Sequence, residues 1–325
     1  MAQTSSLYAV ARLKMLRRRF LSAAQTQRLI AADGSAEALK VLAESGYLSG
    51  DSRDWEAVSL RRTLEASELI KKLSPDSATS DAFLLRYDAH NLKVLFKARI
   101  LGIEPEGITT AGTLNPELLR HAVAEHRYTK LPQALAATMD RLEKLVITTV
   151  DPMAIDVIID QALYQMMAQM LKKSSSPAAR GWLRLKADGI NLVSYIRLRH
   201  MAATLPYAEV LVPGGAISAQ DLQAAAHEPE RLLKLYDKVY GGQLVALARK
   251  ALEDTRQTAA LERAIEARLL ASFDHTALDI EGMDSVIAYL VALEKENTAL
   301  RLIMAGKRAG LSPEQIEERL RGQHG

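Results

Sequence analysis

The sequence predicts an all-helical protein, on the strength of three observations. Runs that alternate apolar and polar residues between turn residues, the pattern of a half-buried strand, are nearly absent. Only 5% of the residues are aromatic. Apolar residues instead recur at helical spacing, as at Leu13, Leu16 and Phe20, between glycine, proline and capping residues. We therefore expect a succession of amphipathic helices.

Start and stop signals place the first helices. A first helix over residues 6–32 should stop at Asp33-Gly34, where glycine can adopt the left-handed C-cap conformation. Ser35 should cap a short second helix that runs to Tyr47, and a third should cover residues 53–73. Ser80 or Asp81 should cap a fourth that ends at Gly102. The remaining helices are expected over residues 131–150, 153–173, 179–204, 229–252, 257–272 and 283–309.

Composition bounds the class of protein. The 325 residues are 48% hydrophobic, which is ample for a buried core that needs no disulfides or structural metals. The absence of cysteine excludes disulfides, thiolate zinc sites and cysteine nucleophiles. A net charge of +3 is far from the excess of a nucleic-acid-binding protein. No run of about 18 apolar residues occurs, so we expect no insertion into the bilayer.

The central feature of the sequence is a helical motif that occurs three times. Each copy places an acid eleven residues before a base, and the first two copies add an asparagine three residues after the acid. Ala299 stands at the asparagine position of the third copy, so a polar contact at that level is not expected there. The residues that we single out are Asp88, Asn91 and Arg99, then Asp188, Asn191 and Arg199, then Glu296 and Lys307.

A second signal repeats with nearly the same period. A glycine precedes a capping residue by three positions at Gly112 and Asn115, where Pro116 follows, and again at Gly215 and Ser218. A period near 100 residues exceeds that of the common solenoids. We therefore expect three similar helical domains, covering residues 1–112, 113–213 and 214–325.

The repeated acid and base share one apolar helix face, because steps of 4, 7 and 11 residues bring the helix direction nearly back to its start. Eleven residues is about 16 Å of rise, too far for the two to pair with each other. Their partners must lie on other helices, units or subunits. One interpretation has the acids capping or pairing locally, with the bases favouring helix C-termini. The other has them lining a surface that three equivalent units offer to a partner.

Catalytic and metal-binding patterns are lacking. The sequence has no phosphate-binding loop that ends in Lys-Ser or Lys-Thr, no His-Glu-x-x-His and no Gly-x-Ser-x-Gly. His121 and His126 are five residues apart and fall on different helix faces, which does not suit a metal pair. We expect no catalytic residues, no cofactor and no metal.

In the order and spacing of its motifs, the stretch over residues 7–322 resembles the C-subunit of the prokaryotic V/A-type rotary ATPases, whose eukaryotic counterpart is the d-subunit of the V-ATPases. The motifs that carry the resemblance are Tyr8-Ala9-Val10-Ala11-Arg12, Gly46-Tyr47-Leu48, Tyr87-Asp88 with Asn91-Leu92-Lys93, Asp188 with Asn191-Leu192, and Glu294 and Glu296 with Leu300-Arg301.

The resemblance implies a pseudo-threefold funnel of helical domains that acts as a non-catalytic rotor subunit. It would seat on the cytoplasmic loops of the proteolipid ring, receive the central stalk and transmit torque for proton or sodium transport or ATP synthesis. It would be a peripheral part of a complex on the cytoplasmic side of the membrane. The alternative is a free-standing helical adaptor or nucleic-acid-binding protein that uses the basic first helix, where Arg17-Arg18-Arg19 lies and no acid precedes Asp33.

Overall fold

The computed structural model describes residues 8, 11–13, 15–48, 54–74, 76–148, 151–201, 206–273 and 283–322. Across these ranges the regular secondary structure consists of helices, with no strand, which confirms the all-helical prediction. None of the helices in the described ranges combines the length and the apolar character that crossing a membrane requires.

The helices follow one another along the chain, and three of them exceed the others in length: α5, α9 and α15. Each of these three carries one copy of the repeated motif. The elements are α2 (Ala23–Ala31), α3 (Gly34–Glu44), α4 (Trp55–Leu73), α5 (Ser77–Leu101), α6 (Pro116–Ala124), α7 (Gln133–Thr148), α8 (Pro152–Leu171), α9 (Pro177–His200), α10 (Tyr207–Val210), α11 (Ala219–Ala225), α12 (Pro229–Tyr240), α13 (Gly242–Glu253), the short 3-10 helix η1 (Thr255–Gln257), α14 (Thr258–Ala271), α15 (Met283–Arg308) and α16 (Pro313–Gly322).

The chain forms two compact units. Unit 2 is continuous and covers Asp76–Gly241, whereas unit 1 combines Met1–Pro75 with Gly242–Gly325. The division into three domains that the repeats suggest is a different partition of the chain, and it stays a prediction.

In unit 2, α5 packs along α8 and α6. Two ion pairs, Lys93 Nζ to Asp160 Oδ1 and Lys97 Nζ to Asp156 Oδ1, both 2.6 Å long, show that α5 and α8 run antiparallel. An apolar cluster that includes Leu92, Phe96, Leu119, Met139 and Ile159 fills the space between α5, α6, α7 and α8. Asp88 and Arg99 lie on the apolar face of α5, and that face therefore packs into this core.

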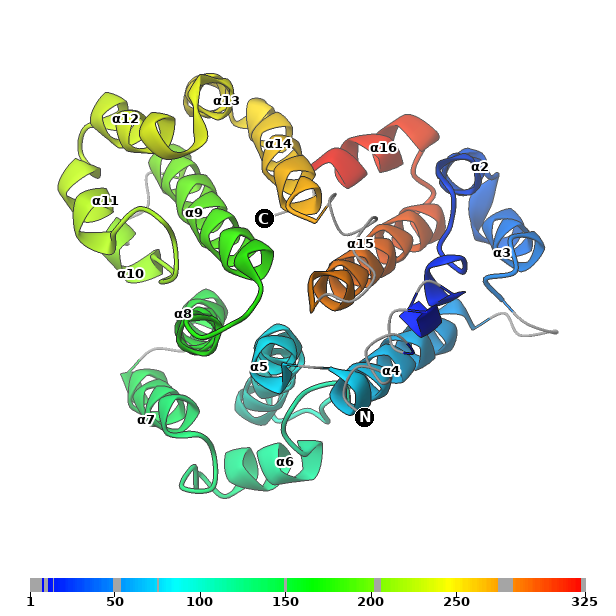
Figure 1. The fold of residues 1–325 in the computed structure, drawn as a ribbon, viewed down its shortest axis with the longest axis horizontal. Coiled ribbons are helices and arrows are strands. Elements are labelled where there is room, and N and C mark those ends of the chain that lie inside the picture. Colours follow the sequence, from blue (N-terminus) through cyan, green and yellow to red (C-terminus); the bar gives the residue numbers. More distant parts are fainter. Residues whose placement is uncertain are drawn as a thin grey trace. The chain divides into compact units, whose positions relative to one another are not determined.

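Unit 1 brings the two ends of the chain together. Helix α15 packs against α3, α4 and α16, and α16 contacts α2. Figure 1 shows α2 and α3 in blue beside α15 in orange and α16 in red. One apolar cluster includes Leu29, Leu42 and Trp55 from the first segment together with Leu300 and Ile316 from the last. Burial of this shared cluster holds the two segments to each other.

Several predicted boundaries are confirmed. Gly102 ends α5 in the left-handed conformation with φ 65°. Asn115 caps α6, which Pro116 begins, and Ser218 caps α11 through a hydrogen bond from the Asp221 amide. The repeated signal of a glycine three residues before a cap therefore marks two helix starts.

The predicted first helix over residues 6–32 is wrong within the described residues, because the chain leaves the helix at Arg18 and begins α2 at Ala23. Ser22 forms a capping box: its hydroxyl accepts from the Gln25 amide, and the Gln25 side chain accepts from the Ser22 amide. Two otherwise unpaired donors are satisfied in this way, which stabilises a new start over a continuous helix.

Three other boundaries also differ from the prediction. Asp33, not Ser35, is the N-cap residue of α3. Asp76, not Ser80 or Asp81, caps α5, since its carboxylate accepts from the Thr79 amide and hydroxyl. The helix predicted over residues 229–252 is two helices, because Gly241 adopts φ 78°, which ends α12 and separates it from α13.

Candidate functional site

Asp88 on α5 binds the segment that leads into α6. The residue is 1% exposed. One carboxylate oxygen accepts from the Thr113 amide at 2.8 Å and the Thr113 hydroxyl at 2.7 Å, and the other accepts from the Leu114 amide at 3.0 Å. Leu114 immediately precedes Asn115, the N-cap residue of α6. A carboxylate is well placed there, because amide donors and the helix dipole both favour negative charge.

Asp188 on α9 makes the equivalent contact with the start of α11. It is fully buried and accepts from the Ala216 amide at 2.7 Å and from the Ile217 amide at 3.4 Å. Ile217 immediately precedes Ser218, the N-cap residue of α11. The Tyr240 hydroxyl also donates to this carboxylate. Burial raises the pKa of Asp188, and the hydrogen bonds from Tyr240 and the two amides partly oppose that rise.

The two repeated asparagines each bind both the backbone N–H and the backbone C=O of one residue. The Asn91 amide nitrogen donates to the Thr109 carbonyl at 2.7 Å, and its oxygen accepts from the Thr109 amide at 3.0 Å. Asn191 does the same with Val212, at 3.0 Å and 2.9 Å. Each asparagine thus satisfies a donor and an acceptor in the segment that follows its own long helix.

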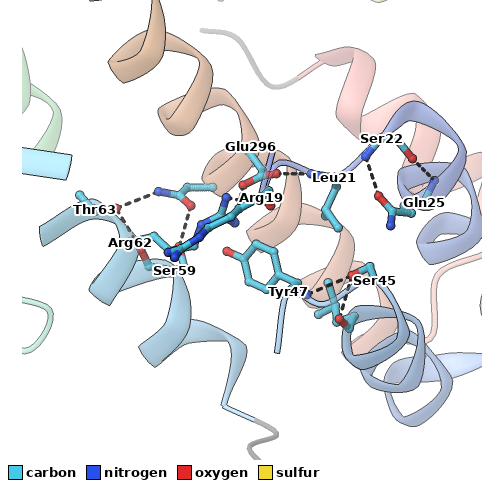
Figure 2. Close-up of polar contacts among 12 residues, drawn as sticks. Arg19, Leu21, Ser22, Gln25, Ser45, Tyr47, Ser59, Arg62, Thr63 and Glu296 are labelled. Atoms are coloured by element: carbon cyan, nitrogen blue, oxygen red, sulfur yellow. Dashed lines mark hydrogen bonds and ion pairs between the residues drawn. The ribbon is translucent and has the colours of Figure 1, made fainter. Parts of the chain in front are cut away.

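Glu296 on α15 makes the third contact of this kind, and it does so with the beginning of the chain. Its Oε1 accepts from the Leu21 amide at 2.6 Å, and Leu21 immediately precedes Ser22, the N-cap residue of α2 (Figure 2). In all three copies the acid therefore binds the amide just before an N-cap. We call these three contacts junction 1 (α5 to α6), junction 2 (α9 to α11) and junction 3 (α15 to α2).

Junction 3 includes a buried arginine that the sequence analysis did not single out. Arg62 on α4 is 7% exposed and pairs with Glu296 Oε2 at 2.8 Å. It also donates to the Arg19 carbonyl at 2.9 Å and lies over the Tyr47 ring, 4.7 Å from its centroid (Figure 2). Burial raises the pKa of Glu296, while Arg62 and the Leu21 amide partly oppose the rise.

The asparagine of the third copy is displaced in sequence. Ala299 occupies the repeat position, but Asn297, next to Glu296, is buried and bonds with two hydroxyls of α4. Its oxygen accepts from Ser59 at 2.8 Å, and its amide nitrogen donates to Thr63 at 3.0 Å. A polar contact therefore persists in the third copy. Its sequence signal is an asparagine that directly follows the acid.

The bases of the first and third copies meet equivalent helix ends. Arg99 donates to the Val123 carbonyl at 2.7 Å, and Val123 lies eight residues after the cap Asn115. Lys307, 5% exposed, donates to the Ala32 carbonyl at 2.6 Å and to that of Ile30, which lies eight residues after the cap Ser22. Each cation thus faces the last turn of a nine-residue helix, where positive charge is favourable.

The base of the second copy does not follow this arrangement. Arg199 is exposed and lies 6.0 Å from the centroid of the Tyr195 ring on its own helix. Helix α11 has seven residues, two fewer than α2 and α6, so the eighth residue after its cap lies beyond the end of the helix. The acid is therefore used alike in all three copies, and the base in two.

The chemistry of the junctions is that of structural hydrogen bonding. Their carboxylates accept from backbone amides, hydroxyls or Arg62, which satisfies buried acceptors in place of water. Among the residues that the structure describes, no group of three His, Asp or Glu side chains is arranged to hold a metal ion.

Taken together, the fold and these junctions define a helical protein whose repeated polar residues fasten one helix to the start of another. The chain belongs to the family described as ATP synthase (C/AC39) subunit, whose model matches residues 9–319.

Three relatives each match 72% or more of the chain. It is 24% identical to the C-subunit of the A-type ATP synthase of Haloferax volcanii over 96% of both chains. It is 28% identical to the C-subunit of the V-type ATP synthase of Thermus thermophilus over 72% of both. It is 24% identical to the C-subunit of the V-type sodium ATPase of Enterococcus hirae over 89% of both. The resemblance seen in the sequence motifs is thus confirmed at the level of the family.

Proposed function

We propose that this protein is a non-catalytic rotor subunit of a V/A-type ATPase, a socket that couples the central stalk to the membrane proteolipid ring. The observation that carries the proposal is the match of residues 9–319 to the ATP synthase (C/AC39) subunit family. In this role the protein transmits torque for ion transport or ATP synthesis. It works at the cytoplasmic side of the membrane as a peripheral part of the complex.

The junctions support a role in which the protein must resist twisting. A part that passes torque needs its helices fixed to one another, and each junction ties a long helix to the start of a different helix through buried, charge-assisted hydrogen bonds. The three long helices then act as the repeated walls of a three-part socket, with domains near residues 1–112, 113–213 and 214–325. Asp88, Arg99, Asp188, Glu296 and Lys307 serve as contacts between those domains. Asn91 and Asn191 bind backbone groups within their own domains.

The partners that we propose are central-stalk subunits and the cytoplasmic loops of the proteolipid ring. The tagged full chain, incubated with detergent-solubilised membranes of its own source, should recover both kinds of subunit. Beads that carry the tag alone are the control. Recovery of neither subunit would remove the proposal.

The same experiment distinguishes the rotor subunit from the alternative function. An adaptor or nucleic-acid-binding protein that uses the basic residues around Arg17 should capture nucleic acid, and that capture should fall steeply as salt is raised. Capture of stalk and ring subunits that survives a moderate salt wash, with no nucleic acid recovered, favours the rotor subunit.

A further inference from the structure

Junction 3 differs from the other two in the length of chain that it spans. Asp88 binds the Leu114 amide 26 residues away, and Asp188 binds the Ile217 amide 29 residues away. Glu296 binds the Leu21 amide 275 residues away. Junctions 1 and 2 therefore join neighbouring parts of unit 2, whereas junction 3 joins the two separate segments of unit 1.

The buried polar contacts of α15 cross between those two segments. Glu296 binds Leu21 and Arg62, and Lys307 binds the carbonyls of Ile30 and Ala32. Removal of one partner from a buried charge pair leaves the other charge buried without compensation. Loss of Glu296 would therefore leave the Arg62 guanidinium, in a residue that is 7% exposed, without its compensating carboxylate.

We propose that Glu296, Arg62 and Lys307 form a latch that closes unit 1, and that its release separates residues 8–74 from residues 242–322 while unit 2 stays folded. The proposal goes beyond the rotor function and does not depend on it. We call this set of three residues the latch.

The apolar cluster that spans both segments opposes release, so opening is a local event of low population. The strength of the polar contacts in the latch then determines how often unit 1 opens. In unit 2, a broken junction leaves its partners tethered by fewer than 30 residues of chain, so they stay at high effective concentration and close again. Once the cluster has also opened, the latch partners are connected only by the long path of the chain through unit 2.

The absence of cysteine makes the test direct. Ala38 on α3 and Ala225 on α11 are both fully buried, the first in unit 1 and the second in unit 2. Each is replaced by cysteine in a separate full-length chain, and the rate of maleimide labelling is measured under native conditions. Labelling of a buried thiol reports the opening that exposes it.

Glu296→Gln should speed labelling at position 38 by about tenfold or more and leave the rate at position 225 within about twofold. Asp188→Asn is the matched control at junction 2, and it should not speed labelling at position 38. Equal acceleration at both positions after Glu296→Gln would indicate global unfolding, and that result or an unchanged rate at position 38 would overturn the latch.

A second latch variant covers the case in which Glu296→Gln does not fold. Lys307→Met removes the donor to the Ile30 and Ala32 carbonyls and keeps a long side chain in the core. It should produce the same selective acceleration at position 38. Because labelling is measured on the isolated chain, failure of the latch and failure of partner capture are separate results.

Discussion

Gly112 leaves the space that the carboxylate of Asp88 occupies, since a Cβ on Gly112 would lie 2.1 Å from Asp88 Oδ1. Gly215 stands in the same relation to Asp188, with a distance of 2.0 Å. In both cases the next residue donates its amide to that carboxylate. The requirement for glycine at these two positions is therefore one of close approach between a backbone and a buried acid.

Gly112→Ala should destabilise the protein by about 2–4 kcal/mol, because the added methyl group and the Asp88 carboxylate cannot occupy the same space. The measurement is urea unfolding of the purified chain. Gly181→Ala is the control, since that glycine lies inside α9 with nothing within 4 Å of the added Cβ. It should be neutral or stabilising by up to about 1 kcal/mol. Similar losses at the two positions would contradict the steric account.

Asn91→Ala should cost about 2–3 kcal/mol, because the backbone N–H and C=O of Thr109 would both lose their buried partner. Asn191→Ala should behave alike, since Val212 is held in the same way. Hydrogen exchange provides a local readout: the Thr109 amide should exchange faster in Asn91→Ala and keep its rate in Asn191→Ala. A loss of protection at Thr109 in both variants would count against two independent contacts.

The bases of the first two copies should differ in their contribution to stability. Arg99→Gln removes a donor to the Val123 carbonyl and to Glu143, and should cost about 1–3 kcal/mol. Arg199→Gln alters an exposed side chain and should change the free energy of unfolding by less than about 0.5 kcal/mol. Thermal unfolding of the two variants side by side tests this difference, and equal effects would refute it.

Glu143 should make stability depend on pH. Burial favours its neutral form, but hydrogen bonds from Arg99 and Tyr128 outweigh burial and lower the pKa of Glu143. A carboxyl whose pKa is lower in the folded state contributes stability above its unfolded pKa and loses it as the pH falls. Glu143→Gln should therefore be less stable than the wild type by about 1 kcal/mol at pH 7, and the gap should narrow as the pH falls below the unfolded-state pKa of a glutamate, about 4.3.

The pH series requires unfolding curves for both proteins at each pH. A constant gap between wild type and Glu143→Gln from pH 7 to pH 3 would show that the carboxylate charge does not contribute.

Local signals in the sequence were sufficient for the fold class and many helix ends. Gly102, Asn115 and Ser218 act at single positions through backbone conformation and capping, so a single sequence reveals them. The same chemistry was present in Ser22 and Gln25, whose spacing is that of a capping box. The apolar spacing across residues 13–20 favoured one long helix over it, and that prediction was wrong.

The junctions could be predicted only in part. The acids and the glycines were both recognised as repeats, yet their contact was not, because the two lie on different segments whose approach depends on the fold. Asp88 precedes Gly112 by 24 residues and Asp188 precedes Gly215 by 27, so no constant spacing links them. The contact between Glu296 and Leu21 spans nearly the whole chain and has no local signature.

The division of unit 1 between the two ends of the chain also orders events during synthesis. Unit 2 is continuous, so all of its residues have left the ribosome before α15 and α16 are made. Residues 15–48 emerge before unit 2, but Leu29 and Leu42 lack their partners Leu300 and Ile316 until α15 and α16 appear. A segment that is made before unit 2 is therefore buried only after it, with its apolar side chains exposed while unit 2 is translated.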